Sequence, residues 1–291
     1  MKPILVTGAS GFIGSHLTER LVELGYPVKA FVHYNFQNKW GWLDHSQVKN
    51  DIEVVSGDIR DYDSVSKAVK GCDTVFHLAA LIGIPYSYSS PIAYIKTNVI
   101  GSYNVLQTSL EHDLDNVLIT STSETYGMAQ YVPIDENHPL KGQSPYSATK
   151  IAADELARSY HLSFGLPLKI VRPFNTYGPR QSNRAIIPTI ICQIISGSKE
   201  IKLGNLNPTR DLNYVKDTVN GFINIFQSSS TIGKVINIAQ NTEYSIGEVV
   251  NQIQKIMGTK LPVVIDDDRL RPDNSEVFRL SGDNSRLKEL T

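Results

Sequence analysis

The sequence predicts an α/β fold in which a doubly wound parallel sheet carries a smaller C-terminal lid. Six short apolar runs, rich in valine and isoleucine, alternate with longer amphipathic patterns over the first 172 residues. No hairpin turn joins consecutive runs, so we expect parallel strands with helices on both faces of the sheet. After residue 173 the alternation becomes irregular, which indicates a smaller unit at the carboxyl edge of the sheet.

The expected elements follow one another along the chain. The strands span residues 4–7, 28–32, 52–56, 74–78, 116–121 and 168–172. The helices span residues 12–24, 61–70, 91–111 and 147–164, and then 185–196 and 245–257, with a short strand at 201–203 and a strand-to-helix stretch at 212–226. Residues 1–177, to which about 210–240 return, form the expected sheet domain, and about 178–209 with 241–291 form the expected lid.

The composition is that of an ordinary globular chain of 291 residues, 41% hydrophobic and 20% charged. Twenty-eight Lys and Arg against 29 Asp and Glu leave a net charge of −1, so nucleic acid is not an expected partner. No apolar run reaches the ~18 residues of a membrane span, and the N-terminus turns glycine-rich too soon for a signal peptide. Cys72 and Cys192 offer neither a disulfide framework nor metal-ligand spacing. We expect a cytoplasmic protein without membrane contact or metal site.

A glycine-rich turn follows the first expected strand and opens the first expected helix. Gly8 permits a tight turn, Gly11 lets the backbone approach a pyrophosphate, and Gly14 allows the helix to pack closely on the strand. The N–H groups at the start of this helix, at Phe12 and Ile13, offer a partial positive charge to phosphate. The sequence therefore predicts a Rossmann-like dinucleotide-binding domain.

The type of dinucleotide stays open between NAD and NADP. An acid at the end of the second strand would bind the ribose hydroxyls of NAD. His33 and Asn35 stand there instead, with Lys39 as the nearby cation, which slightly favours NADP. Asp58, followed by Ile59, comes after the third strand. It is placed either to bind the adenine amino group or to cap the helix over 61–70.

Tyr146 and Lys150 are spaced four residues apart, so they lie on one face of a helix. A phenol with a reference pKa of ~10 is a poor base at neutral pH. A lysine ammonium one turn away, together with a positively charged nicotinamide, would stabilise the phenolate and lower its pKa. The pair follows a fifth strand whose end carries Thr122, Ser123 and Glu124, and this order favours a catalytic role for Tyr146 and Lys150.

Together, these motifs resemble the extended short-chain dehydrogenase/reductase family and, within it, the nucleotide-sugar epimerases and dehydratases. The resemblance covers essentially the whole chain. It rests on Gly8-x-x-Gly11-x-x-Gly14, Phe76-His77-Leu78-Ala79-Ala80, Asn98-Val99-x-Gly101, the Tyr146/Lys150 pair, residues 172–180, Arg210-Asp211 and Arg271-Pro272. It implies a tightly bound, recycled cofactor whose further contacts are Leu78, Ala79, Ala80, Asn98 and Pro173. It also implies that Tyr146 acts as base at the sugar 4-hydroxyl, with Lys150 and Thr122 as partners.

The acidic residue after the fifth strand, Glu124, helps to distinguish a dehydratase from an epimerase. In the family that the chain resembles, 4,6-dehydratases carry Thr-Asp-Glu there, and 4-epimerases carry small or hydroxyl residues; this chain has Thr122-Ser123-Glu124. A ketone at C4 acidifies the C5 proton, which we expect Glu124 to remove and pass to the leaving C6 oxygen, with Ser123 positioning it. We expect a redox-neutral 4,6-dehydration, in which the hydride taken from C4 is returned to C6; its return to C4 would make the protein a 5,6-dehydratase. A 5,6-dehydratase, a 4-epimerase or a net oxidoreductase are alternatives on the same fold, and an inactive nucleotide sensor or scaffold is an alternative of another class.

The resemblance further implies a nucleotide-sugar substrate, whose diphosphate suits the planar fork of arginine. The expected substrate contacts are Tyr86, Ser87, Asn175, Arg180, Ile187, Pro188, Arg210 and Arg271. Long stretches, among them 121–127 and 129–136, are most similar to the N-acetylhexosamine 4,6-dehydratases of bacterial nonulosonic (legionaminic-type) acid pathways. This similarity implies UDP-GlcNAc, or else GDP-GlcNAc, as substrate and a role in cell-surface glycan biosynthesis.

Relatives of this kind form dimers through a four-helix bundle that uses their two longest helices. Here these helices are expected at 91–111 and 147–164. Val99, Tyr103, Leu106 and Leu110 share one face of the first helix, which fits either this bundle or internal packing. A homodimer is the expected assembly.

Overall fold

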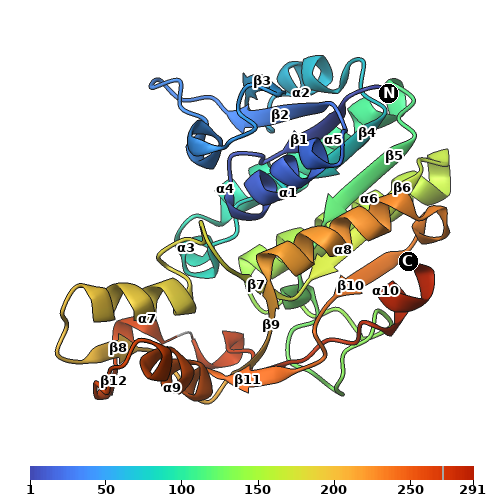
Figure 1. Cartoon of the computed structure of the whole chain (residues 1–291). Helices are drawn as coiled ribbons and strands as arrows, with labels where there is room; N and C mark the ends of the chain where they lie inside the picture. Colours follow the sequence, from blue (N-terminus) through green and yellow to red (C-terminus); the bar gives the residue numbers. More distant parts are fainter. Residues whose placement is uncertain (271) are drawn as a thin grey trace.

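The computed structural model confirms the Rossmann-like parallel sheet (Figure 1). It describes residues 1–270 and 272–291, without the side chains of Asp268 and Asp273. Seven strands, all parallel, run in the order β10-β6-β5-β4-β1-β2-β3. They are β1 Ile4–Thr7, β2 Val28–His33, β3 Ile52–Gly57, β4 Thr74–His77, β5 Asn116–Thr120, β6 Leu168–Pro173 and β10 Val235–Ile238. The strand order reverses between β1 and β4, and ligands of such sheets bind at the carboxyl side of that point.

Six of these strands lie where the sequence predicts them, within two residues, and the edge strand β10 was not predicted. Its four-residue run is interrupted by Asn237, a polar residue that a buried strand seldom carries. The structure shows why Asn237 is tolerated. Its amide is fully buried, accepts the hydroxyl of Tyr126 at 2.8 Å and donates to the carbonyl of Ile134 at 3.1 Å.

Helices cover both faces of the sheet, as predicted. One face carries α1 Phe12–Glu23 and α8 Val215–Gln227, which pack against each other (Figure 1). The other face carries α2 Tyr62–Val69, α5 Gly101–Glu111 and α6 Pro145–Phe164. The connection from β2 to β3 holds only the short 3₁₀ helix η1 Gly41–His45.

The predicted helix over 91–111 is a continuous stretch of three differently wound segments. α4 Pro91–Tyr94 leads into a π-helical segment, η2 Ile95–Ile100, and then into α5. Apolar spacing alone does not distinguish such a widened turn from an ordinary helix, so no sequence pattern indicates it. The π-helical segment carries Asn98, whose side chain is almost completely buried.

The lid elements lie together below the sheet in Figure 1 and have an apolar core of their own. They are α7 Ile186–Ile195, β8 Ile201–Leu203, α9 Ile246–Ile256 and β12 Val263–Ile265. Short strands connect the lid to the sheet: β7 Asn175–Tyr177, β9 Thr209–Tyr214, β11 Glu243–Ser245 and β13 Arg279–Leu280. The remaining elements are α3 Ile84–Ser89, η3 Ser123–Thr125, η4 Ser229–Thr231, η5 Asp267–Arg269, η6 Asp273–Ser275 and α10 Ser285–Leu290.

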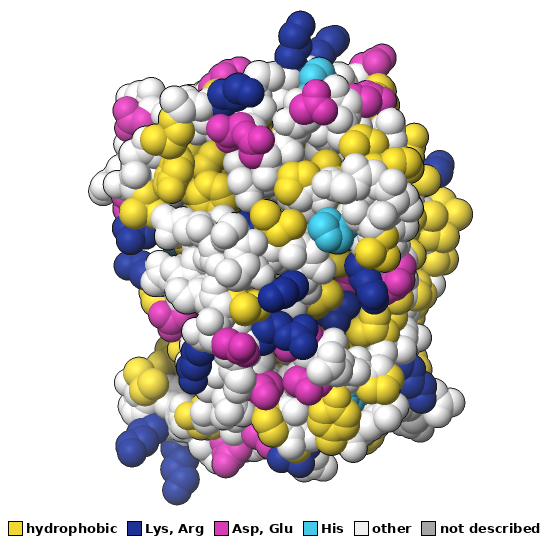
Figure 2. All heavy atoms as spheres, turned by 90° about the vertical axis from the view of Figure 1, so that its right-hand side faces the viewer, with side chains coloured by type: hydrophobic (Ala, Val, Ile, Leu, Met, Phe, Trp, Pro, Cys, Tyr) yellow, Lys and Arg dark blue, Asp and Glu magenta, His cyan; other side chains and the backbone are white. Residues whose placement is uncertain are grey.

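The division into a sheet domain and a lid stays a prediction at its boundaries. The predicted lid includes residues 241–291, yet α10 packs against α8 and β10 of the sheet layer. On the face shown in Figure 2, positive and negative side chains are interspersed rather than gathered by sign. Within the described part of the chain, no helix combines the length and the apolar character needed to cross a membrane.

Candidate active site

The glycine turn after β1 has room for no side chain at two of its positions. A Cβ on Gly14 would lie 2.1 Å from the carbonyl oxygen of Gly8, and a Cβ on Gly8 would lie 2.8 Å from the amide nitrogen of Ala79. Gly8 also has a φ of +70°, which glycine adopts without strain. The loop after β4 is fastened to the same turn, because the amides of Leu78 and Ala79 donate to the Thr7 hydroxyl at 3.1 and 3.2 Å.

Helix α1 begins at this turn with its backbone donors open to an anion. Its N-cap, Gly11, provides no side-chain cap, and its first turn carries no acid. The N–H groups of Phe12 and Ile13 are therefore oriented as a phosphate site requires. The turn and the helix fit a dinucleotide pyrophosphate, with Ala79 and Ala80 on the neighbouring loop.

The expected adenosine end lies where β2 and β3 finish side by side. His33 pairs in register with Gly57, next to Asp58. The Asn35 amide closes its own loop, donating to the Lys39 carbonyl at 2.7 Å and accepting the Lys39 amide at 3.2 Å. The adenosine contacts of His33, Asn35 and Lys39 stay predictions.

Asp58 does not cap the helix that follows it, so this alternative is wrong. Asp61 is the N-cap of α2 and accepts the amide of Asp63. The carboxylate of Asp58 instead forms a forked ion pair with Arg60, which holds its pKa below the usual range. Ile59 packs on Gly101 of α5. The adenine contacts of Asp58 and Ile59 stay predictions.

The five predicted catalytic residues come together where α6 meets the end of β5. Ser144 caps α6 with a reciprocal capping box, and Tyr146 lies in the first turn of the helix. The Thr122 hydroxyl is hydrogen-bonded to the Tyr146 phenol and also accepts the Glu124 amide at 3.3 Å. One turn further along α6, the Lys150 ammonium donates to the Thr120 carbonyl at 2.5 Å. Thr122 thus links the phenol to the turn that carries Ser123 and Glu124.

Burial controls the electrostatics of this group. It raises the pKa of Tyr146 above its usual range, and the hydrogen bond from Thr122 opposes that rise. It lowers the pKa of Lys150, which the charge of Asp154 opposes. Burial and the Lys150 charge together lower the pKa of His77 to about 3, so this imidazole is neutral at physiological pH. A buried tyrosine of this kind needs nearby positive charge to act as a base.

Asn98 fastens the loop after β4 to α6. Its amide donates to the carbonyl of Leu81 at 3.0 Å and to the Thr149 hydroxyl at 3.1 Å, and accepts the Leu81 amide at 2.8 Å. Because Thr149 precedes Lys150, this clamp helps to set the position of the lysine. Direct cofactor contacts of Asn98, and of Pro173 at the end of β6, stay predictions.

The residues predicted to contact the sugar and the base differ in their burial and hydrogen bonding. Asn175 on β7 has a buried amide oxygen without a hydrogen-bond partner in the described structure, which suits a ligand contact. Tyr86 on α3 is half exposed, whereas Ser87 is fully buried and donates to the Ile84 carbonyl of its own helix. Ile187 and Pro188 lie in the first turn of α7 and are partly buried.

The two predicted arginines that the structure describes have different environments. The Arg180 guanidinium forms a forked pair with Glu19 of α1 at 2.9 and 3.0 Å. Arg210 is nearly buried, donates to the Val277 carbonyl at 2.8 Å and lies 3.6 Å from Glu276. Arg271 lies outside the described residues. Their contacts with a diphosphate stay predictions.

Two charged residues of this region were missed at the level of sequence. Asp154 and Arg172 are buried and paired directly behind Lys150, at 2.8 Å. Asp154 lies four residues after Lys150, so extending the tyrosine–lysine spacing by one turn would have found it. Tyr94 of α4 was also missed; its ring contacts that of Tyr146 edge-on at 6.3 Å.

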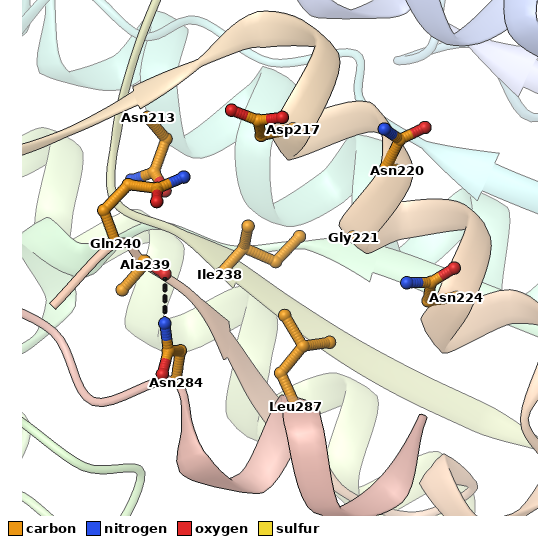
Figure 3. Close-up of a pocket in the computed structure, with 10 residues that line it drawn as sticks. All are labelled: Asn213, Asp217, Asn220, Gly221, Asn224, Ile238, Ala239, Gln240, Asn284 and Leu287. Carbon is orange, nitrogen blue, oxygen red and sulfur yellow. Dashed lines mark hydrogen bonds between the residues drawn. The ribbon is translucent and has the colours of Figure 1, made fainter.

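A cavity of about 350 Å³ lies apart from these groups, between α8, β10 and α10 (Figure 3). Side-chain amides and one carboxylate dominate its lining: Asn213, Asp217, Asn220, Asn224, Gln240 and Asn284. None of the predicted site residues that the structure describes belongs to this lining.

The sheet, the glycine turn and the tyrosine–lysine pair define a short-chain dehydrogenase/reductase enzyme. Comparison with known proteins gives the family: residues 5–291 match the one described as GDP-mannose 4,6 dehydratase. The chain belongs to this family, which comprises nucleotide-sugar dehydratases, epimerases and decarboxylases.

Three similar proteins illustrate the range of reactions. A putative UDP-glucose 4-epimerase of Methanocaldococcus jannaschii is 30% identical over 99% of this chain and 92% of its own length. A UDP-N-acetyl-alpha-D-glucosaminuronate decarboxylase of Bacillus cytotoxicus is 32% identical over 99% of this chain and 91% of its own. The crystal structure of a double mutant of DesIV, the dTDP-glucose 4,6-dehydratase of Streptomyces venezuelae, has NAD bound. It superposes with a TM-score of 0.89 at 26% identity, covering 99% of this chain and 90% of that one.

Replacing Gly14 by alanine tests the dinucleotide turn. The added Cβ would lie 2.1 Å from a backbone oxygen that cannot retreat without opening the turn. We expect Gly14→Ala to weaken NAD binding, measured by calorimetry, by about tenfold or more, since a loss of ~1.4 kcal/mol suffices. Gly247→Ala on α9 is the matched control, because its Cβ meets nothing closer than 3.7 Å. Wild-type affinity in Gly14→Ala would contradict this role of the turn.

Proposed function

We propose that the protein catalyses the redox-neutral 4,6-dehydration of a nucleotide-activated N-acetylhexosamine, with UDP-GlcNAc as the first candidate. The observation that carries this proposal is the position of Glu124 on the turn that also holds Tyr146 through Thr122. A carboxylate next to the tyrosine is what the removal of a second proton requires. The decarboxylase relative, whose named substrate is an N-acetylated UDP-sugar, supports this class of sugar.

The residues divide the work of the reaction between them. Tyr146, as the phenolate, takes the proton of the 4-hydroxyl, Lys150 stabilises that phenolate, and Thr122 holds both the phenol and the substrate hydroxyl in place. A dinucleotide bound at the glycine turn supplies a reversible hydride acceptor. Once C4 is a ketone, Glu124 removes the C5 proton and delivers it to the C6 oxygen, which leaves as water and gives a C5–C6 double bond conjugated with the ketone. The hydride taken from C4 would then return to C6 while a proton from solvent is added at C5, so that the dinucleotide is oxidised again at the end of the turnover. Ser123 is buried beside Glu124. It has no carboxyl group that could donate a proton to the leaving oxygen, so its proposed role is to orient the turn.

The cofactor is proposed to stay bound and to be regenerated in each turnover. The dinucleotide turn has the geometry for a pyrophosphate, and the related dehydratase structure holds NAD. The slight preference for NADP rests on the missing acid after β2 and remains part of the proposal. A place in nonulosonic-acid or other cell-surface glycan biosynthesis follows only if the product is the 4-keto-6-deoxy sugar.

A 4-epimerase is the second candidate. Tyr146 and Lys150 are sufficient for oxidation and reduction at C4, and one relative is named a putative UDP-glucose 4-epimerase. An epimerase leaves the C5 proton in place, whereas a dehydratase must remove it. A 5,6-dehydratase also removes the C5 proton but leaves a double bond between C5 and C6. A net oxidoreductase converts added cofactor between its oxidised and reduced forms, and an inactive sensor binds the dinucleotide without forming a product.

Incubation of the purified protein with UDP-GlcNAc in heavy water, without added cofactor, tests the proposal. We expect mass spectrometry to show the loss of one water and the gain of one deuterium, which NMR places at C5, with a ketone at C4. The same reaction with GDP-GlcNAc and with added NADP covers the other nucleotides. A product of unchanged composition that carries no deuterium at C5 would establish epimerisation and contradict dehydration.

The variant Glu124→Gln separates the two proton transfers. Glutamine keeps the shape but cannot accept the C5 proton, so we expect the dehydration rate to fall by roughly 10²-fold or more. Reduced-nicotinamide absorbance should still appear when UDP-GlcNAc is added to cofactor-loaded protein, because Tyr146 and Lys150 are intact. Glu155→Gln, an exposed position on α6, is the control and should behave as wild type. Full dehydration by Glu124→Gln would remove this residue from the mechanism.

We also propose a homodimer that uses the outer face of residues 91–111. Ile92, Ile95, Ile100 and Tyr103 are each at least 41% exposed there, more than isolated apolar side chains explain. Leu106, predicted on the same face, is instead fully buried in the core of the protomer, which shows that this part of the face serves internal packing.

Light scattering at micromolar concentration tests the assembly. We expect twice the chain mass of 32.3 kDa for the wild type. Ile100→Glu should shift the mass to that of one chain, because a buried unpaired carboxylate opposes association. Ile256→Glu, at an exposed position on the lid helix α9, should leave the dimer intact. A wild-type protein of one chain mass would contradict the dimer.

A further inference from the structure

A column of three polar residues on α6 faces the sheet, and the mechanism above uses only two of them. Tyr146, Lys150 and Asp154 follow one another at intervals of four residues, one helical turn apart. Asp154 is completely buried, and its ion-pair partner Arg172 on β6 is 3% exposed. Burying a carboxylate this completely costs free energy unless hydrogen bonds and an ion pair compensate for the lost hydration.

The partners of Asp154 are distributed unevenly between its two oxygens. Oδ2 accepts the Ser121 hydroxyl at 2.5 Å and the Arg172 guanidinium at 2.8 and 3.2 Å. Oδ1 is buried as well and has no hydrogen-bond partner in the described structure. The guanidinium also lies over the Tyr126 ring at 5.0 Å, so it is fixed between that ring and Oδ2 of the carboxylate. Asp154 thus has one oxygen without a hydrogen-bond partner in the described structure, and its charge acts on Lys150 one turn earlier on α6.

We propose that Asp154 is a positioning residue that keeps the buried Lys150 protonated and anchors the turn carrying Glu124. This inference rests on the proposed role of the Tyr146–Lys150 pair. It assigns Asp154 no contact with substrate or cofactor.

The charged surroundings of Lys150 support the first role. Tyr146 and Asp154 lie one helical turn before and after Lys150 on α6, and Lys150 is near enough to His77 of β4 to lower its pKa. Glu124 of η3 acts on Tyr146, and Arg172 of β6 is paired with Asp154. His77 is neutral, and Arg172 opposes a second positive charge. Burial alone lowers the pKa of Lys150, and the negative charge of Asp154 acts against this effect. A neutral Lys150 would no longer stabilise the Tyr146 phenolate, so the counter-charge serves the reaction through the lysine.

The second role follows from Ser121. This residue directly follows β5, its amide donates to the Val171 carbonyl at 2.7 Å, and its hydroxyl donates to Asp154. Thr122 comes next in the chain, and the Glu124 amide is bonded to it. One carboxylate thus fixes the start of the turn that brings Thr122 to Tyr146, and also lies one helical turn from Lys150.

A direct titration of Lys150 tests the proposal without any sugar substrate. Lysine labelled with ¹³C at Cε is incorporated into the protein, NAD is added, and the Lys150 resonance is assigned by its loss in Lys150→Met. We expect Asp154→Asn to lower the pKa of Lys150 by about one pH unit or more. Arg172→Gln, which removes the opposing cation, is expected to raise it. Because no substrate is present, an error in the proposed reaction leaves this result unchanged.

The effect of Asp154 is measured twice, so one poorly folding variant does not prevent the test. The first comparison is wild type against Asp154→Asn. The second is Arg172→Gln against the double variant Asp154→Asn/Arg172→Gln, in which no buried charge is left unpaired at this pair. We expect a lower lysine pKa in each variant that lacks the carboxylate. An unchanged pKa in either folded comparison, or shifts of the same sign in Asp154→Asn and Arg172→Gln, would show that Asp154 does not keep Lys150 protonated and would overturn the inference.

Discussion

The packing of the polar face of α6 against the ends of β5 and β6 is the constraint on which the site depends. It removes a tyrosine, a lysine and an aspartate from water at once, so each must be satisfied by protein groups. Thr122 hydrogen-bonds the phenol, the Thr120 carbonyl accepts from the ammonium, and Ser121 and Arg172 hold the carboxylate. Three of these partners are consecutive residues, 120–122, so the end of a single strand sets the geometry of the helix face.

The same sheet edge brings the cofactor site to the catalytic group. Two side chains connect the glycine turn after β1 to the start of α6 through the loop after β4. The Thr7 hydroxyl binds this loop next to the glycine turn, and the Asn98 amide binds the same loop to α6. In the proposed mechanism, a dinucleotide bound at the glycine turn lies along this loop and reaches Tyr146. The proposal also assigns the oxidation at C4 to Tyr146 and Lys150, and the later fate of the oxidised sugar to residues 122–124 after β5.

Much of this could be predicted from the sequence, because strands of valine and isoleucine, a glycine turn and a four-residue spacing are all local patterns. The features that could not be predicted depend on contacts distant in sequence. β10 carries the buried Asn237, whose side-chain amide is hydrogen-bonded to Tyr126 and Ile134, residues about a hundred positions earlier in the chain. The π-helical segment at 95–100 does not alter the spacing of apolar residues, so the sequence pattern does not indicate it. The sequence position of Asp58 suits a helix N-cap, yet Asp61 caps α2 and the Asp58 carboxylate forms an ion pair with Arg60. Leu106 follows Tyr103 by three residues on α5, which places the two side chains about 60° apart around the helix. That difference is enough for Leu106 to be fully buried while Tyr103 is 41% exposed.

The central claim is that the β5 turn presents Glu124 to the same sugar whose 4-hydroxyl meets Tyr146. A crystal structure of the protein with NAD and UDP-GlcNAc, using Tyr146→Phe to prevent turnover, tests this most directly. We expect the sugar 4-hydroxyl to lie at the edge of the substituted ring and within hydrogen-bond distance of the Thr122 hydroxyl, with the Glu124 carboxylate facing C5 and C6. A sugar bound with C5 and C6 turned away from Glu124 would contradict the claim.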